Sequence, residues 1–315
     1  MSKKVLSGTH VLVAAAAALL LASCAGPDSS LGGATSASTP PIVSTTSPAL
    51  APSSPTTPVA TTTPPMTAPP MAAPATAATA TSVVLTEGPL AVFDFAATQL
   101  AVGTSIEGRP ITADRYGTPG GRRVLVIGVI HGDEDAGVAI IDELRERDVP
   151  DGVELWVIES MNPDGQAAQN RQNANQVDLN RNFPHKWGVI GEPGNSQYAG
   201  TGPASEPETQ AMVNLITQLR PDIAVWYHQD ANLIIPSTGR DGQIRARYAE
   251  LAALPLADCC GGGGVYTGIA ASWAKNELQK DSDAVAFIVE LPGGVLSTQQ
   301  VNAHANAVLT IGIEG

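Results

Sequence analysis

Continuous apolar runs alternate with segments of helical spacing along the last two thirds of the chain. Residues 123–130 form a run rich in β-branched side chains, which is typical of a strand buried on both faces. Strands are predicted at residues 123–130, 153–158, 223–227 and 285–289. Helices are predicted at residues 136–147, 205–219, 243–254 and 298–311. This alternation predicts an α/β domain with a largely buried sheet, in which ligand-binding residues gather where strands end.

Two short motifs sharpen these boundaries. Met161-Asn-Pro-Asp-Gly165 follows a predicted strand and has the composition of a turn. Ser205-Glu-Pro-Glu208 matches a capping box, with Ser205 at the N-cap and Glu208 three positions later. We therefore expect this helix to open at Ser205 and to run to about Leu219.

Residues 1–23 have the parts of a secretory signal peptide. Two lysines precede an apolar run from Val11 to Ala22, which is shorter than the roughly 20 residues that a spanning helix needs. Leu21-Ala-Ser-Cys24 resembles the lipobox of bacterial lipoproteins, whose cysteine is acylated after cleavage. We expect Cys24 to carry the lipid and to hold the protein on a membrane surface. An uncleaved anchor helix is the alternative.

Residues 24–82 are rich in Pro, Thr, Ser and Ala and contain no aromatic residue. Such a segment cannot bury enough apolar surface to offset its chain entropy, so we expect a disordered tether. The chain would then be an exported, cell-surface or membrane-anchored lipoprotein of a bacterium. The other two cysteines, Cys259 and Cys260, are adjacent and lack the spacing of a zinc site. A strained vicinal disulfide and a pairing between molecules both stay open.

The remaining segment, residues 83–315, is expected to be a single compact, acidic domain. The whole chain of 315 residues has a net charge of −13, and this segment alone carries −14. An acidic domain repels phosphate backbones, so no nucleic-acid partner is expected. The hydrophobic content of 43% suits a globular core and excludes a wholly disordered chain.

The first candidate chemistry lies just past two strand ends. His131 and Glu134 directly follow the strand 123–130, and His228 directly follows the strand 223–227. Imidazole and carboxylate ligands suit Zn²⁺, and a catalytic zinc ion takes three protein ligands and leaves one position open. Taken singly, the His-x-x-Glu pair is weak evidence, and His228 alone fits a histidine bonded to a backbone carbonyl better than a ligand.

Two further features strengthen this interpretation. Glu290 closes an apolar strand, where a carboxylate is costly unless it has a partner or a task. Amide and charged side chains are also unusually dense between residues 162 and 184. They lie in Asn162-Pro-Asp-Gly165, in Arg171-x-Asn173 and in Val177-Asp-Leu-Asn-Arg-Asn-Phe-Pro184.

In this order, these motifs resemble the carboxypeptidase A-like zinc carboxypeptidase family. The branch with the best agreement is the bacterial murein peptide amidases, which share the His-Gly-Asp-Glu, Val-Asp-Leu-Asn-Arg-Asn-Phe-Pro and Ser-Glu-Pro-Glu-Thr-Gln-Ala strings. The likeness extends from about Thr104 to Gly312. It implies a mixed, mostly buried sheet sandwiched between helices.

The resemblance also implies a division of roles at the metal. One zinc ion would be held by His131, Glu134 and His228. Glu290 would be the general base, and Arg171 would stabilise the oxyanion together with the zinc ion. Asp178 would brace the loop or a ligand histidine rather than react.

For the substrate, the resemblance implies that Asn180 and Arg181 bind a carboxylate. A structural ion pair is the alternative for Arg181. Tyr266 is the candidate for the family's mobile tyrosine, although its spacing to Trp273 is shorter than in the digestive enzymes, and a core or surface tyrosine is the alternative. The residue that would set side-chain preference is Ala271, which is small and uncharged and argues against selecting basic or acidic ends.

The expected function is zinc-dependent hydrolysis of an amide bond beside a free carboxylate. The preferred substrate would be a murein peptide, cut between γ-D-glutamate and diaminopimelate. A carboxypeptidase acting on ordinary peptides is the nearest alternative. A non-catalytic lipoprotein that binds wall peptides is the alternative from another class, and the complete set of ligands and base argues against it.

Overall fold

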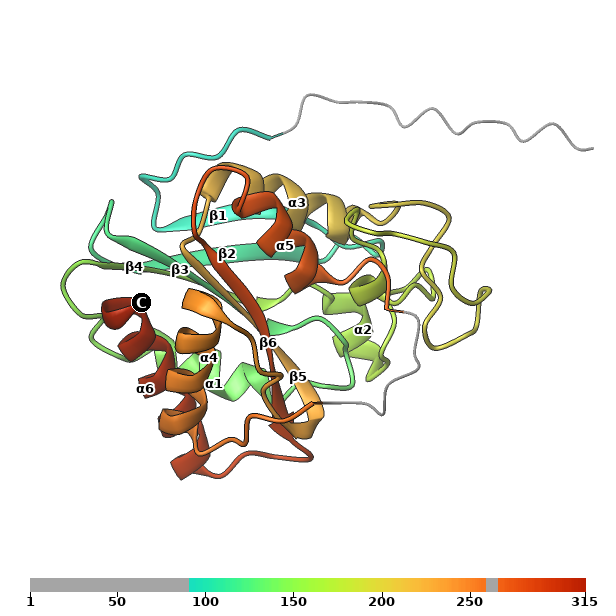
Figure 1. The fold of residues 1–315 in the computed structure, drawn as a ribbon. Coiled ribbons are helices and arrows are strands. Elements are labelled where there is room, and N and C mark those ends of the chain that lie inside the picture. The colour runs from blue at the N-terminus through green and yellow to red at the C-terminus, as the bar shows by residue number, and fades with distance from the viewer. Residues whose placement is uncertain (1–90, 259–265) are drawn as a thin grey trace, which may run out of the picture. The chain divides into compact units, whose positions relative to one another are not determined.

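The most apolar runs of the chain form the middle of a six-stranded sheet in a computed structural model, which describes residues 91–258 and 266–315 (Figure 1). The strands are β1 (Gln99–Thr104), β2 (Pro110–Gly117), β3 (Arg122–Val129), β4 (Val153–Ser160), β5 (Ile223–Leu233) and β6 (Val285–Pro292). Their order is β1-β2-β4-β3-β5-β6. Strands β4, β3, β5 and β6 run parallel, and β1 and β2 pair antiparallel. The predicted mixed α/β sheet is confirmed.

The periodicity analysis missed the two antiparallel strands. In β1, Leu100 and Val102 are buried while their neighbours are not, and Ile111 and Ala113 repeat this pattern in β2. Antiparallel strands at a sheet edge commonly bury one face only, so they lack the continuous apolar run that marks β3. The signal in these strands is a period of two over a few residues.

Helices cover both faces of the sheet (Figure 1). They are α1 (Gly137–Arg145), α2 (Pro163–Ala168), α3 (Pro207–Leu219), α4 (Gly239–Ala252), α5 (Ala270–Leu278) and α6 (Thr298–Glu314), with one 3₁₀ turn, η1 (Leu179–Arg181). Helices α1, α4 and α6 pack on one face, and α3 and α5 pack on the other. In the two described stretches, no helix is long and apolar enough to cross a membrane.

Two local predictions are wrong. The segment expected to be a turn at residues 161–165 opens the short helix α2, because Asn162 caps it by accepting the Gly165 N–H and Pro163 occupies its first turn. The capping box at Ser205 does not form: α3 begins at Pro207, and its N-cap residue makes no side-chain cap hydrogen bond. The side chain of Glu208 is used elsewhere, as described below.

The strands that carry the candidate site are longer than predicted. Strand β5 continues to Leu233 and β6 to Pro292, so His228 and Glu290 lie within strands rather than at their ends. These two residues are Cα partners in the parallel β5–β6 pair. Register partners on adjacent parallel strands point to the same face of a sheet, so their side chains lie side by side.

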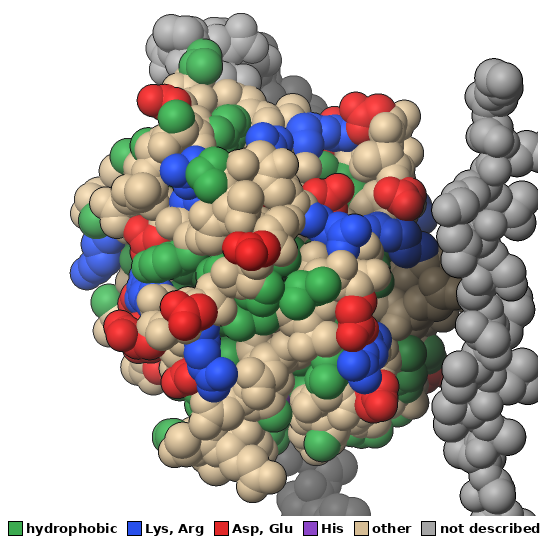
Figure 2. All heavy atoms as spheres, turned by 90° about the vertical axis from the view of Figure 1, so that its left-hand side faces the viewer, with side chains coloured by type: hydrophobic (Ala, Val, Ile, Leu, Met, Phe, Trp, Pro, Cys, Tyr) green, Lys and Arg blue, Asp and Glu red, His purple; other side chains and the backbone are tan. Residues whose placement is uncertain are grey.

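The expected signal peptide at residues 1–23, the tether at residues 24–82, and Cys24, Cys259 and Cys260 lie outside the described residues. These expectations stay predictions. On the described domain, the face shown in Figure 2 carries acidic and basic side chains side by side. Several of these charges form ion pairs at the surface, such as the pair between Arg247 and Glu314 at 2.8 Å.

A buried polar chain links β5 to α4 and α6 inside the apolar core. The hydroxyl oxygens of Tyr227 and Tyr248 lie 2.8 Å apart, and the Tyr248 hydroxyl lies 3.0 Å from Nδ1 of His304. His304 is 1% exposed, and its burial lowers the pKa to about 4 from a usual value of 6.5. The folded protein therefore keeps this imidazole neutral, as an acceptor for the tyrosine O–H.

The stability of the domain is expected to fall as the pH drops from about 6.5 to about 4. In this window His304 is protonated in the unfolded chain but stays neutral in the folded chain. This difference in proton binding lowers the free energy of unfolding by about 3 kcal/mol. Denaturant unfolding of the wild type and of His304→Gln at pH 7 and pH 4 measures the effect. Glutamine can accept from Tyr248 but does not titrate, so equal losses in the two proteins would contradict this prediction.

Candidate metal centre

The turn after β3 is shaped by two glycines that lie against each other. His131-Gly132-Asp133-Glu134 packs directly on α2, where a Cβ atom at Gly132 would lie 1.9 Å from the carbonyl carbon of Gly165. Only glycine allows this approach. The strand thus delivers a buried His131, 1% exposed, at the carboxyl edge of the sheet, with the Glu134 carboxylate beside it.

Three side chains converge at this edge. Nδ1 of His131 lies 2.9 Å from one carboxylate oxygen of Glu134, and Nδ1 of His228 lies 3.0 Å from the other. The ligand atoms of the three residues all lie within 4.8 Å of one another. His228 therefore joins His131 and Glu134 in one group of donors, although it lies almost a hundred residues later in the sequence.

The donor chemistry of this group fits a zinc ion. Two imidazole nitrogens and one carboxylate make up a common catalytic zinc set. Burial lowers the pKa of His228 to about 4, so its ring stays neutral, which is the form that binds metal. Although burial opposes it, the hydrogen bonds to the two histidines hold the pKa of Glu134 well below its usual range. His228 and Glu134 are thus in the state that a cation requires. Although burial opposes them, the carboxylates of Asp178 and Glu134 raise the pKa of His131, so a cation that binds there displaces a proton from this ring.

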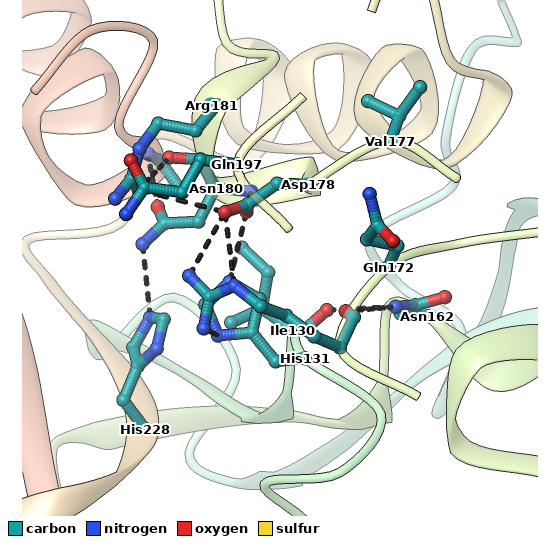
Figure 3. Close-up of polar contacts among 12 residues, drawn as sticks. Ile130, His131, Asn162, Gln172, Val177, Asp178, Asn180, Arg181, Gln197 and His228 are labelled. Atoms are coloured by element: carbon teal, nitrogen blue, oxygen red, sulfur yellow. Dashed lines mark hydrogen bonds and ion pairs between the residues drawn. The ribbon is translucent and has the colours of Figure 1, made fainter. Parts of the chain in front are cut away.

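A second carboxylate orients one of these histidines. Asp178 is fully buried and lies 3.0 Å from Nε2 of His131, on the side of the ring away from Glu134 (Figure 3). Despite its burial, the charges of His131, Arg171 and Arg181 hold the pKa of Asp178 well below its usual range. A carboxylate on the outer nitrogen of a ligand histidine fixes the tautomer and the ring orientation.

Arg171 lies against the same group. Its guanidinium places Nη1 2.9 Å from Glu134 and 3.1 Å from Nδ1 of His131, and Nη2 2.9 Å from Asp178. A cation therefore already sits beside the converging donors. The predicted oxyanion residue lies within reach of any group that approaches the metal position.

Asn180 and Arg181 come from η1, next to Asp178 (Figure 3). The Asn180 side chain accepts the backbone N–H of Ala270 at 2.9 Å, and its Nδ2 lies 3.3 Å from Nε2 of His228. This amide thus joins the start of α5 to the metal group. Its neighbour Arg181 is buried, 5% exposed, and its Nη1 donates to the Asn180 carbonyl oxygen.

Tyr266 covers this arginine. The ring centroid of Tyr266 lies 5.5 Å from the guanidinium carbon of Arg181, a cation–π distance, while the tyrosine itself is 52% exposed. Of the three environments considered for Tyr266, the structure shows a partly exposed ring beside the candidate substrate residues. Ala271 is buried in the first turn of α5, one residue after the N–H that holds Asn180.

Glu290 stands next to His228 in the sheet register and is partly buried. Burial and the nearby charge of Glu134 raise its pKa. It is the carboxylate of this edge that is not engaged with the histidines, since the hydrogen bonds of Glu134 and Asp178 go to them. Its environment suits a group that exchanges a proton.

Asn162, which the sequence analysis named only as part of a motif, ties two segments of the site together. Asn162 is fully buried, and its Nδ2 donates to the carbonyl oxygens of Ile130 at 3.0 Å and of Arg171 at 3.3 Å. It therefore fastens the segment that carries Arg171 to the strand that carries His131. The available signal was Asn before Pro, a common start of a helix, where the Asn side chain caps the first turn.

The comparison with protein families agrees with this geometry. Residues 94–255, about half of the chain, match the model of the zinc carboxypeptidases. The chain belongs to the zinc carboxypeptidase family. The metal of this family is zinc, and His131, Glu134 and His228 are the group that could hold it in the described part of the chain.

Individual relatives include murein peptide amidases. The chain is 32% identical to murein peptide amidase A of Escherichia coli over 148 residues, which cover 44% of this chain and 60% of the relative. It is 33% identical to the enzyme of the same name from Vibrio campbellii over 146 residues, or 43% of this chain and 59% of the relative. The sequence match thus spans about three fifths of the length of these relatives.

Solved structures extend the likeness of this zinc carboxypeptidase to most of its domain. The murein-tripeptide amidase of Escherichia coli superposes with a TM-score of 0.55 at 27% identity, covering 68% of this chain and 92% of the other. Carboxypeptidase A of Helicoverpa armigera has a TM-score of 0.59 at 18% identity, covering 69% of this chain and 68% of the other. The second likeness shows a shared fold.

Gly132→Ala is expected to weaken zinc binding by this family member at least about tenfold. The added methyl group would overlap the Gly165 backbone, so the turn would have to shift at a cost of about 1–3 kcal/mol. Competition with a chromophoric chelator measures the zinc affinity. Gly202→Ala is the matched control, because a Cβ there meets no atom within 4 Å. Unchanged affinity in Gly132→Ala would show that the turn tolerates displacement.

Proposed function

We propose that this protein is a zinc-dependent hydrolase that cleaves an amide bond beside a free carboxylate. The observation that carries the proposal is the buried guanidinium of Arg181. In the described residues, its Nε has no hydrogen-bond partner, and its nearest acid, Asp178, is 4.0 Å away. A buried charged group with an unmet donor is costly, and an anionic ligand would remove that cost.

The position of Arg181 matches a substrate whose carboxylate lies one residue from the cleaved bond. Asp178 already accepts from Arg171 and faces His131, so it is a poor partner for a second guanidinium. Asn180 is adjacent, and its amide points toward His228. A carboxylate placed between Asn180 and Arg181 would therefore leave the neighbouring amide bond at the metal group.

The reaction then divides among the residues of this edge. When bound, zinc supplies a Lewis acid that polarises the scissile carbonyl and lowers the pKa of water. Glu290 takes a proton from the attacking water and returns it to the leaving nitrogen. Arg171 donates to the developing oxyanion, while Asp178 holds both Arg171 and His131 in place.

The preferred substrate is a murein peptide, cut between γ-D-glutamate and diaminopimelate. Support comes from the relatives named murein peptide amidase and from the export signal and tether expected for residues 1–82. Export on a lipid tether would place the protein on the same side of the membrane as the bacterial cell wall.

Turnover of a purified murein tripeptide, with and without a chelator, tests this proposal. We expect cleavage that chelation abolishes and zinc restores. Robust turnover that ignores the chelator would refute zinc dependence. Binding of the tripeptide without cleavage by the zinc-loaded protein would favour the wall-peptide-binding lipoprotein instead.

Ordinary peptides are the second candidate substrates. The small, uncharged Ala271 in the first turn of α5 argues against selection of a basic or acidic C-terminal side chain. Rates on L-peptides with apolar C-terminal residues, measured beside the tripeptide, separate the two. A higher kcat/KM on L-peptides would make the protein a carboxypeptidase of general peptides.

We further propose that Cys24 is lipidated and anchors the protein at the bacterial surface. The support is the Leu-Ala-Ser-Cys string after an apolar run, followed by a Pro- and Thr-rich segment. Metabolic labelling with an alkyne fatty acid is expected to mark the wild type and not Cys24→Ser. Equal labelling of both would overturn the assignment.

A further inference from the structure

The Ser205-Glu-Pro-Glu208 motif has no role in the chemistry above, and it does not cap its helix with a side chain. Glu206 is 4% exposed and Glu208 is fully buried, at the start of α3. Burying two carboxylates this close together is expensive. In the described part of the chain, neither has a Lys, Arg or His partner at ion-pair distance. Their cost must be met by other contacts.

Glu206 is satisfied by three side-chain donors. Its Oε2 accepts from Nδ2 of Asn173 and from Nδ2 of Asn175, both at 2.9 Å, and its Oε1 accepts the Ser205 hydroxyl at 2.7 Å. Its backbone N–H donates to Oδ1 of Asn182 at 3.2 Å. Glu206 thus touches residues 173 and 182, the two ends of one segment.

Glu208 reinforces the first of these ends. Its Oε2 accepts from Nδ2 of Asn173 at 3.2 Å, and its Oε1 accepts the backbone N–H of Ile106 at 3.1 Å. Both hydrogens of the Asn173 amide therefore go to the two glutamates. Burial, with the neighbouring charge of Glu206, raises the pKa of Glu208 although its hydrogen bonds oppose this.

Asn173 in turn forms hydrogen bonds with the backbone of the segment that follows it. Its Oδ1 accepts the N–H groups of Asn175 and Val177 at 3.1 and 3.0 Å, and its own N–H donates to the Val177 carbonyl oxygen. Asp178 follows directly. The segment 173–182 is irregular apart from η1, so these side-chain bonds replace the ladder that would hold a strand.

We propose that Glu206 and Glu208 are positioning residues for the substrate-carboxylate subsite. Their carboxylates hold the start of the segment 173–182 that carries Asn180 and Arg181, and the backbone N–H of Glu206 holds its end. The inference rests on the proposed function for its kinetic consequence. The hydrogen bonds of the two carboxylates go to other residues than the three ligands and Glu290. The two glutamates act on catalysis by fixing where the Arg181 guanidinium lies.

The test uses Glu206→Gln and Glu208→Gln in the zinc-loaded full-length protein. Glutamine has one carbonyl oxygen, so at position 208 it cannot accept from both Ile106 and Asn173. We expect KM for the murein tripeptide to rise about tenfold with kcat changed less than about threefold, since one hydrogen bond to a charged group is lost. The exposed Glu192→Gln is the matched control and should leave both constants unchanged.

A double-mutant cycle separates positioning from general destabilisation. If Glu208 acts through Arg181, Glu208→Gln should change kcat/KM little in an Arg181→Ala background. An equal loss in both backgrounds would overturn the proposal. Should the buried variants fail to fold, Asn175→Asp places a carboxylate against Glu206 from the surface and is expected to raise KM severalfold. An unchanged KM in that folded variant would also contradict the proposal.

Hydrogen–deuterium exchange provides a readout that does not depend on turnover. In Glu208→Gln, amides of the segment 173–182 are expected to exchange at least about tenfold faster, with those of β3 and β5 unchanged. Equal exchange in the wild type and the variant would refute the proposal that Glu208 holds this segment. If the wild type showed no hydrolysis, the proposed function would fail, while this measurement would still test whether Glu208 holds the segment.

Discussion

Replacing Glu290 with glutamine is expected to lower kcat by about two to four orders of magnitude while leaving zinc bound. Glu290 is the carboxylate of the site that the histidines do not engage, and it lies beside His228 in register. Glutamine keeps its shape but cannot take a proton from water or return one to the leaving nitrogen. The positions of the ligands should not change.

Steady-state kinetics on the murein tripeptide, with zinc content by atomic absorption, measure both parts of this result. Glu159→Gln is the matched control, since Glu159 lies near the end of β4 in the same sheet and pairs with Arg145 instead of facing the metal group. Full activity in Glu290→Gln would remove its role as base. A variant that lost zinc as well as activity would assign Glu290 to metal binding.

Glu134→Gln is expected to weaken zinc binding by more than about 100-fold and to abolish hydrolysis with it. Glu134 lies between the two imidazoles, and its carboxylate is the one negative ligand of the trio. Even residues that orient ligands typically account for roughly 10–100-fold in metal affinity, so loss of a charged ligand should exceed that.

Competition titration with a zinc chelator gives the affinity, and the gain in Tm on adding zinc gives a second measure. The wild type should be stabilised by zinc, whereas Glu134→Gln should not. Asp133→Asn is the control for the charge change, because Asp133 is the exposed neighbour of Glu134. Equal zinc affinities in wild type and Glu134→Gln would place the metal elsewhere.

Long apolar runs predicted the centre of the fold well. Strands β3, β4, β5 and β6 and helices α1, α3, α4 and α6 lie where the hydrophobic pattern put them, because a strand buried on both faces or an amphipathic helix leaves a strong local signal. Strands β1 and β2 and helix α5 were not predicted. Their patterns are short, and burial of one face of a short strand is decided by what packs on it.

The candidate site shows the same division. His131, Glu134, His228 and Glu290 could be picked out because polar residues beside buried strands are rare and costly. The role of Asn162 could not be predicted, since its hydrogen-bond partners are the backbone carbonyls of positions 130 and 171. The role of Glu208 was misjudged for a related reason. Its spacing from Ser205 fits a local cap, but the donors that satisfy it belong to Ile106 and Asn173.

From the sequence alone come the kinds of chemical group, their order along the chain and the elements that bear them, because composition and periodicity are local properties. Which groups meet is a property of the folded sheet: its parallel register sets Glu290 beside His228, and the packing of Gly132 on Gly165 delivers His131 to the same edge. Contacts between residues this far apart in the sequence leave no periodic trace, so only the tertiary structure could decide them.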